Sequence, residues 1–127
     1  MKTHEMKLLK EPFLEIKEGR KTVEMRLFDE KRRGISAGDE IVFSCPDLPE
    51  EELCVRAEGT YIYEDFRELA AGFPAESLGF PGRSAEYIAD YMENIYSSRD
   101  VEKYGAFAIK IILKNNLPIS TKKSKKI

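Results

Sequence analysis

The clearest pattern of apolar and polar residues in the chain is a strict alternation over residues 23–27. Its apolar members are Val23, Met25 and Leu27. Successive side chains of a β-strand point to opposite faces, so these three residues are expected to face a core. Glu24 and Arg26 then lie together on the other face. The pattern predicts a strand with one side for packing and one side for polar chemistry.

Four other segments are predicted to be strands, and they span residues 6–9, 40–44, 53–63 and 106–113. Ile41 and Phe43 lie on the same face of the second of these, which follows a Gly-Asp turn signal. Gly59 interrupts the alternation of the third segment. This glycine predicts a bulge or bend, which would let one long strand serve two walls of a small barrel.

Helices are predicted from capping residues and from apolar residues three and four positions apart. Pro12 starts a helix that ends before Gly19. Asp65, Ser84 and Ser97 are the expected N-caps of three later helices. The apolar face of the helix after Ser84 consists of Ile88, Tyr91, Met92 and Ile95.

The predicted order is strand, helix, three strands, helices and a final strand. Hairpin connections dominate, and no alternation of parallel strands with helices recurs. This order predicts an α+β fold with a small, mostly antiparallel, curved sheet or barrel and helices packed at its ends.

Length and composition fit one soluble domain. The chain has 127 residues, of which 42% are hydrophobic and 35% charged. It contains neither an apolar run long enough for a membrane span nor a signal-peptide core, so we expect a cytoplasmic protein with no membrane partner. With two cysteines and one histidine, we expect no metal, no cofactor and no Ser-His-Asp triad. Nothing in the sequence predicts an oligomeric state.

Charge is distributed unevenly along the chain, although the net charge is only −2. Residues 17–33 hold seven Lys or Arg against four Asp or Glu, whereas residues 34–102 hold four against sixteen. Residues 103–127 hold seven lysines and no acidic residue. We therefore expect one domain over residues 1–114 and a basic, flexible tail over 115–127, which would add either affinity for polyanions or solubility.

Lys21, Glu24 and Arg26 are the strongest candidates for chemistry, because they place an ammonium, a carboxylate and a guanidinium on one side of one strand. If the chain is an enzyme, Lys21 and Glu24 are the expected catalytic pair. The simpler alternative is that Glu24 and Arg26 form ion pairs on a sheet face while Lys21 is solvated.

Other residues are candidates for ligand contacts. The basic cluster Lys31, Arg32 and Arg33 is suited to phosphate, although such loop clusters are commonly just solvated. Thr22 would either hydrogen-bond a ligand or cap the turn. Aromatic residues suited to stacking on a base are Tyr61, Tyr63, Phe66, Phe80 and Tyr104. Tyr96, Ser97 and Tyr104 are further candidates because they lie at the ends of predicted elements.

Three stretches at their spacing resemble the ASCH family, a branch of the PUA-like superfamily. Residues 19–26 fit the family signature G-x-K-x-x-E-x-R, residues 38–43 resemble its Gly-Asp entry to the next strand, and residues 95–97 with 104–109 resemble its closing helix and strand. The resemblance covers the chain from about Met6 to Leu113. It implies a PUA-like β-barrel with a cleft on one side, lined by Lys21, Glu24 and Arg26.

The resemblance also implies two kinds of function. ASCH domains are generally proposed to bind RNA, and we expect RNA or a nucleotide or nucleoside as the ligand. Some members are amidohydrolases that remove an acyl group from acetylcytidine, and some are described as ribonucleases. The amidohydrolases have a lysine at the position of Lys21, a threonine at that of Glu24 and a glutamate near Pro81, where the nearest acids of this chain are Glu76 and Glu86. Two of those three positions therefore differ here.

Overall fold

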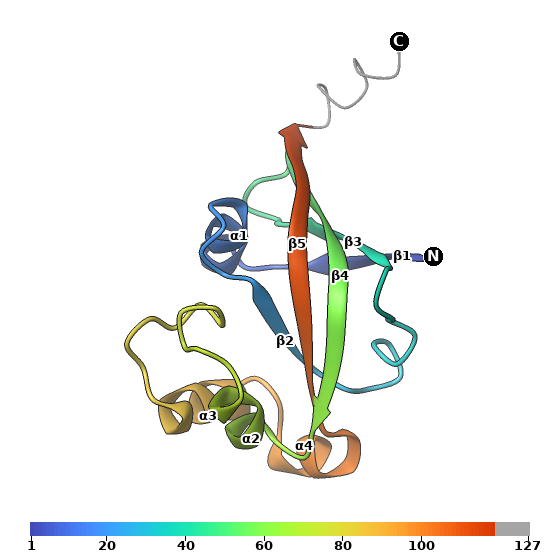
Figure 1. Ribbon diagram of the computed structural model, residues 1–127. Helices are drawn as coiled ribbons and strands as arrows, with labels where there is room; N and C mark the ends of the chain where they lie inside the picture. The colour runs from blue at the N-terminus through green and yellow to red at the C-terminus, as the bar shows by residue number, and fades with distance from the viewer. Residues whose placement is uncertain (119–127) are drawn as a thin grey trace.

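The computed structural model describes residues 1–118, which form five strands and four helices (Figure 1). The strands are β1 (Thr3–Lys7), β2 (Val23–Leu27), β3 (Glu40–Ser44), β4 (Glu51–Tyr63) and β5 (Ala106–Pro118). The helices are α1 (Lys10–Lys17), α2 (Phe66–Ala71), α3 (Ala85–Glu93) and α4 (Ser98–Tyr104). No helix in this described part of the chain is long and apolar enough to cross a membrane.

All five strands belong to one curled sheet, in the order β1-β3-β4-β5-β2. The pairs β3/β4, β4/β5 and β5/β2 are antiparallel, whereas β1 pairs with β3 in parallel. The parallel pair is possible because α1 and β2 supply the long crossover that such a connection needs. The predicted α+β fold with a mostly antiparallel, curved sheet is confirmed, and its form is a half-barrel with β1 and β2 at the edges.

The two longest strands, β4 and β5, run through the middle of the molecule (Figure 1). Their pairing shifts register between Ala57 and Gly59, which confirms the bulge predicted at this glycine. Such a shift increases the local twist of a strand. It lets the same pair of strands contribute to two separate cores.

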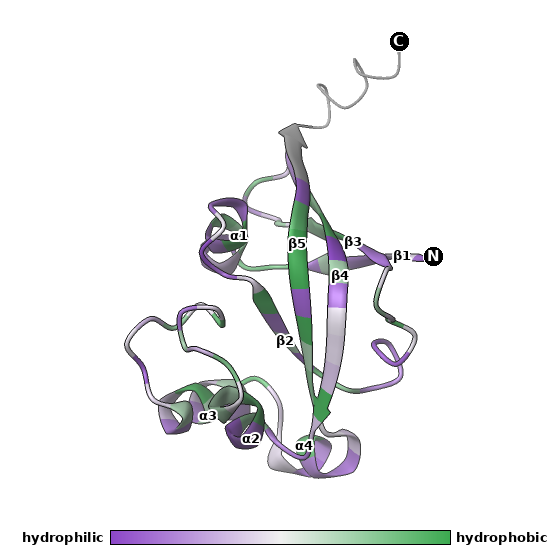
Figure 2. Ribbon diagram, viewed as in Figure 1, coloured by the Kyte–Doolittle hydropathy of each residue, from purple (hydrophilic) through white to green (hydrophobic). Residues whose placement is uncertain are grey.

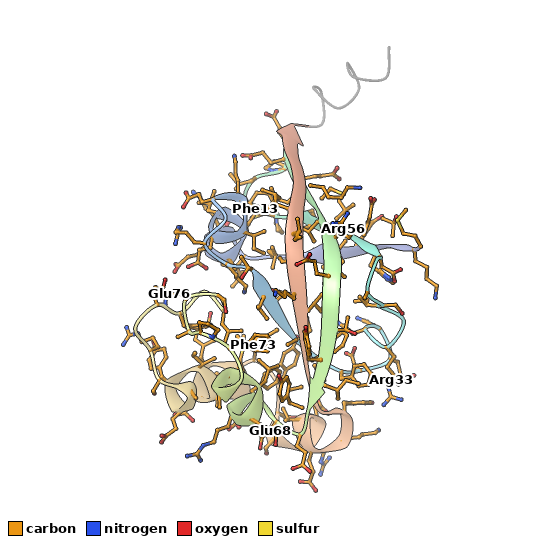
Figure 3. All side chains as sticks on the ribbon, viewed as in Figure 1. Phe13, Arg33, Arg56, Glu68, Phe73 and Glu76 are labelled. Atoms are coloured by element: carbon orange, nitrogen blue, oxygen red, sulfur yellow. The ribbon has the colours of Figure 1, made fainter. Side chains whose placement is uncertain are left out.

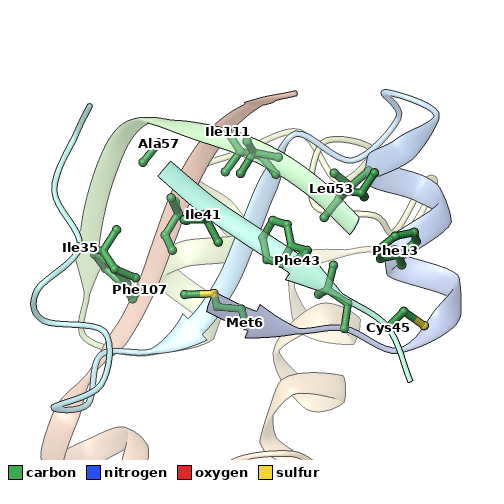
Figure 4. Packing of buried hydrophobic residues seen from close by; sticks show 14 residues of the cluster. Met6, Phe13, Ile35, Ile41, Phe43, Cys45, Leu53, Ala57, Phe107 and Ile111 are labelled. Atoms are coloured by element: carbon green, nitrogen blue, oxygen red, sulfur yellow. The ribbon is translucent and has the colours of Figure 1, made fainter. Parts of the chain in front are cut away.

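The first core fills the concave side of the sheet and is covered by α1. Phe13 of this helix is fully buried against residues of β3, β4 and β5, including Phe43, Leu53 and Ile109. Figure 4 shows these side chains converging between the strands and α1.

The second core lies between β2, β5 and the helices α2, α3 and α4. Val23, Met25 and Leu27 pack there, as their alternation predicted. Ala106 and Ala108 of β5 face the same core, whereas Phe107 and Ile109 face the first. Figure 2 shows the resulting run of apolar residues along β5. Both faces of β5 are therefore covered, and on β2 the polar residue Glu24 is also buried.

Capping residues begin the helices where the sequence predicted. Asp65, Ser84 and Ser97 each accept a hydrogen bond from the backbone N–H three residues later. Gly105 ends α4 with a φ of 86°, a conformation that favours glycine. These caps fix where α3 starts relative to the sheet, which matters because α3 forms one wall of the site.

Three predicted element bounds need correction. Helix α1 begins at Lys10 rather than at Pro12, because Leu9 is its N-cap and already accepts from the N–H of Phe13. The first strand covers Thr3–Lys7 rather than 6–9, because the β1/β3 ladder begins at Thr3. The last strand extends to Pro118, past the predicted end at Leu113, because β4 pairs with it over this length. The basic residues Lys122, Lys123, Lys125 and Lys126 lie outside the described residues.

The predicted apolar face of α3 is only half buried. Ile88 and Met92 are in the second core, but Tyr91 is 43% exposed and Ile95 is 56% exposed. The apolar stripe is therefore wider than the contact between α3 and the core. Its remaining half faces a cleft.

Candidate functional site

A cleft of about 710 Å³ separates the edge of the sheet from the segment 78–96. One side is formed by the end of β1, by α1 and by β2, and the other by the loop before α3 and by α3 itself (Figure 1). On the first side, β1 and α1 pack in the first core, whereas β2 packs with α3 in the second. The cleft therefore lies at the boundary between the half-barrel and the helical layer.

Three charged residues form the floor of the cleft: Lys21, Glu24 and Arg26. The Nζ atom of Lys21 lies 3.0 Å from Oε1 of Glu24, and Nε of Arg26 donates to Oε2 at 2.6 Å. Oε1 is buried and meets the lysine ammonium, and a carboxylate oxygen can accept more than one hydrogen bond. The carboxylate is thus held between two cations.

Burial distinguishes this arrangement from an ordinary surface ion pair. Glu24 is 3% exposed and Lys21 is 9% exposed. Burial by itself raises the pKa of the Glu24 carboxyl, but the charges of Lys21 and Arg26 outweigh it and hold the pKa below its usual value. Glu24 is therefore an anion. The alternative in which Lys21 is simply solvated is wrong, whereas the ion pair between Glu24 and Arg26 is confirmed.

The backbone around Lys21 is fixed on both sides. The N–H groups of Arg20 and Lys21 both donate to the carbonyl oxygen of Glu15, at 2.9 and 3.1 Å. Thr22 then donates to the carbonyl of Ser77 and accepts from the N–H of Ile111. The end of α1, the loop before α3 and the sheet therefore all position the lysine.

Gly79 supports the lysine side chain from the opposite wall. Its φ is +89°, and a Cβ at this position would lie 3.2 Å from Cδ of Lys21 and 3.1 Å from Oε1 of Glu15. Only a residue without a side chain fits here without displacing one of these groups. The glycine thus allows close approach of the loop to the floor of the cleft.

The wall opposite the floor is aromatic. Tyr87 and Tyr91 of α3 are 44% and 43% exposed, and Phe80 packs edge-on against Tyr91 with ring centroids 5.0 Å apart. Tyr96 also lines the cleft, and it stacks on Phe66 at 5.8 Å with an interplanar angle of 7°. The guanidinium of Arg83 lies 4.4 Å from the centre of the Tyr87 ring. Flat apolar surfaces therefore remain open beside a charged floor.

Of the residues predicted for the site, the structure brings together Lys21, Glu24, Arg26 and Tyr96. Thr22 is used in backbone pairing beside the cleft and does not line it. Ser97 caps α4. Tyr104 lines a separate cavity of about 780 Å³ near α4, whose charged lining residues are mainly acidic. Of the five aromatic residues considered for stacking, Phe80 lines the cleft.

The basic cluster lies on the loop after β2, away from the cleft. Arg32 pairs with Asp29 at 2.8 Å, the guanidinium of Arg33 sits 5.4 Å from the Phe28 ring centre, and Lys31 is exposed. Figure 3 shows Arg33 on the opposite side of the sheet from Glu76 of the cleft-side loop. The cluster and the cleft are therefore separate features.

Sequence reasoning missed several lining residues, among them Glu15, Arg83, Tyr87 and Tyr91. Tyr91 was assigned to the core because it lies on the apolar stripe of α3. Tyr87 and Tyr91 are four residues apart and so share one helix face, which was the available signal. No group of three His, Cys, Asp or Glu within residues 1–118 is arranged to hold a metal ion.

Comparison with known proteins identifies the family. The model of the ASCH domain family matches residues 6–115. The chain belongs to the ASCH domain family. The comparison with curated proteins gave no match. The signature residues Lys21, Glu24 and Arg26 of this ASCH domain are those at the floor of the cleft.

Two solved structures share its fold. The crystal structure of hypothetical protein PH0355 is 34% identical, covers 90% of this chain and 100% of its own, and superposes with a TM-score of 0.77. The solution NMR structure of protein PF0455 from Pyrococcus furiosus is 35% identical, covers 89% of this chain and 97% of its own, with a TM-score of 0.65. The expected ASCH assignment and PUA-like fold are confirmed.

Proposed function

We propose that this ASCH domain binds a nucleotide in the cleft, either free or as one unit of single-stranded RNA. The observation that carries the proposal is the pairing of a buried, charged floor with an exposed aromatic wall. A nucleotide combines a flat apolar base, polar base edges and a phosphate. Each of these parts has a counterpart among the lining residues.

The aromatic wall is suited to the base. Tyr87 and Tyr91 are each more than two fifths exposed and lie outside the core, so a base can stack on this wall without rearranging the core. Stacking of one base on an aromatic side chain contributes about 1–3 kcal/mol and tolerates any base. The aromatic wall therefore contributes affinity for any base, and discrimination between bases has to come from the charged floor.

The charges around the cleft favour a short ligand over a long polyanion. Four cationic residues line the cleft, namely Lys7, Lys21, Arg26 and Arg83, and three acidic residues oppose them, namely Glu11, Glu15 and Glu24. Arg83 is exposed and has no carboxylate partner within residues 1–118, so we expect it to meet a phosphate. A nearly balanced cleft suits one or two phosphates.

Titration calorimetry with nucleoside monophosphates tests this proposal. Lys21→Met and Tyr91→Ala are expected to weaken binding at least about tenfold, since each removes a contact of about 1–3 kcal/mol. Lys31→Met is the matched control, because it makes the same change on an exposed residue outside the cleft. Equal affinity of Lys21→Met and Lys31→Met for every nucleotide would contradict the proposal.

A second candidate is hydrolysis of an acylated nucleoside, which the buried Lys21–Glu24 pair in the same cleft favours. In that mechanism Glu24 would move protons while Lys21 activates water. The arrangement of the three charged groups argues against it, because Glu24 is already engaged by Lys21 at 3.0 Å and by Arg26 at 2.6 Å. Glu76 and Glu86 are both exposed and do not line the cleft, so neither supplies the missing acid.

Incubation with acylated cytidines separates the two candidates. Binding without turnover is the expected result. Release of acetate that disappears in Lys21→Met, but not in Lys31→Met, would favour the hydrolase instead. Shortening of a labelled RNA with the same dependence on Lys21 would indicate a ribonuclease.

A further inference from the structure

The floor of the cleft presents a hydrogen-bond donor and an acceptor side by side. Nζ of Lys21 and Oε1 of Glu24 are 3.0 Å apart, and both residues line the cleft. A protonated lysine offers three N–H donors and no acceptor, whereas an ionised carboxylate only accepts. The Glu24 oxygen is itself buried and meets the ammonium of Lys21, and a carboxylate oxygen can accept more than one hydrogen bond. A ligand N–H that reaches the floor can therefore bind this oxygen beside the lysine.

The positions of this donor and acceptor are fixed by their neighbours. Arg26 holds the other Glu24 oxygen at 2.6 Å and is itself anchored to the carbonyl of Lys7 at 2.9 Å. Gly79 confines the alkyl chain of Lys21 from the other side. A ligand therefore meets a preformed donor and acceptor. Its own acceptor has to face Lys21 and its own donor has to face Glu24.

The geometry points to selection of keto bases, whose edge places a carbonyl next to a ring N–H, over amino bases. This inference rests on the proposed nucleotide binding and adds the class of base. Uracil, guanine and hypoxanthine carry a carbonyl oxygen for Lys21 and a ring N–H for Glu24. Both bonds are charge-assisted, and such bonds are about twice as strong as neutral ones.

Adenine and cytosine present the opposite order at the same ring positions. Their exocyclic amine takes the place of the carbonyl, and an unprotonated ring nitrogen takes the place of the N–H. In the keto-base orientation, the amine would face the ammonium of Lys21 and the ring nitrogen would face the Glu24 carboxylate. Turning the base over restores the pairing, but it moves the sugar and phosphate away from the place where they sit for a keto base.

Matched pairs of ligands test the inference on the unaltered protein. Inosine and adenosine monophosphates differ only at this edge, as do uridine and cytidine monophosphates, so stacking and phosphate contacts stay closely matched. We expect the keto member of each pair to bind roughly tenfold more tightly by titration calorimetry. Uridine monophosphate methylated at N3, which lacks the ring N–H, is expected to lose this advantage.

The outcomes distinguish the keto preference from the proposed nucleotide binding on which it rests. Equal affinity within both pairs, with binding still lost in Lys21→Met, would overturn the keto preference and leave nucleotide binding intact. Tighter binding of the amino members would overturn it as well. Failure of all four nucleotides to bind, while the protein remains folded by circular dichroism, would overturn both.

Discussion

Glu24 is the residue on which the floor of the cleft depends. Its carboxylate is 3% exposed and neutralises two cations that are themselves largely buried. An intact buried ion pair contributes little net stability. Removing one member is nevertheless strongly destabilising, because the remaining charge is left in a poorly solvated place.

Glu24→Gln is therefore expected to lower the free energy of unfolding by about 3 kcal/mol, as measured by urea denaturation at neutral pH. Glu76→Gln is the matched control. That residue is exposed, so its change is expected to stay within about 0.5 kcal/mol. Equal stabilities of the two variants would contradict the account of the buried charges.

The pH dependence of the same variant gives an independent test. The folded-state pKa of Glu24 lies below its unfolded value. Its contribution is therefore fully present above the unfolded pKa, about 4.3, and is lost as the pH falls through the folded pKa. The stability difference between wild type and Glu24→Gln should shrink on acidification below about pH 4. A difference that is constant from pH 7 to pH 3 would contradict the lowered pKa.

Gly79 is the second residue whose replacement should affect the floor. Gly79→Ala forces an L-residue to adopt a φ of +89° and places its Cβ against Lys21. Gly38→Ala is the matched control, because Gly38 has a φ of +97° and open space around its Cβ position. Both changes should cost about 1–2 kcal/mol in unfolding experiments. Only Gly79→Ala should also weaken nucleotide binding, and equal binding by the two variants would contradict the role of this close approach.

At the scale of elements, the N-caps provide a comparison between two helices. Ser84 caps α3, which carries the aromatic wall, and Ser97 caps α4, which does not. Each serine accepts a hydrogen bond at 3.1 Å, so either change to alanine should cost about 1 kcal/mol of stability. Ser84→Ala alone is expected to reduce nucleotide affinity, because it loosens the first turn that presents Tyr87. Reduced affinity in Ser97→Ala to the same extent would show that the effect is global.

Arg26 connects the two edges of the half-barrel. It belongs to β2 and donates to the carbonyl of Lys7, the last residue of β1, at 2.9 Å. Arg26→Lys keeps the charge but cannot reproduce both hydrogen bonds, so we expect a loss of about 2 kcal/mol. The control Arg56→Lys, on an exposed residue of β4, should be close to neutral. Equal losses in urea denaturation would argue against this bridge.

Local sequence signals predicted the individual helices and strands better than they predicted which of these elements pack against one another. The three capping residues and the Gly59 bulge were predictable because each depends on short-range backbone chemistry. The parallel pairing of β1 with β3 was not, since it depends on where a distant segment docks. Tyr91 shows the same limit for the site. Its place on an apolar helix stripe is clear from the sequence, but whether the core or a cleft covers that stripe is decided by tertiary packing.

For the whole molecule, charge alone was an incomplete guide to the site. The basic cluster Lys31–Arg33 drew attention because of its composition, yet it lies apart from the cleft. The floor instead combines cations with a buried acid, so its net charge is small while its local fields are strong. Recognition by such a floor depends on the order of donors and acceptors more than on attraction between opposite charges.

The position of a bound nucleotide is the most direct test of the central claim. It can be measured by titrating isotope-labelled protein with a short single-stranded RNA of mixed sequence and following backbone amide shifts. We predict that the largest shifts cluster on both sides of the cleft, at Lys21, Met25, Phe80 and Tyr91. Shifts confined to the Lys31–Arg33 loop or to the cavity beside Tyr104, or no shifts at all, would contradict the account.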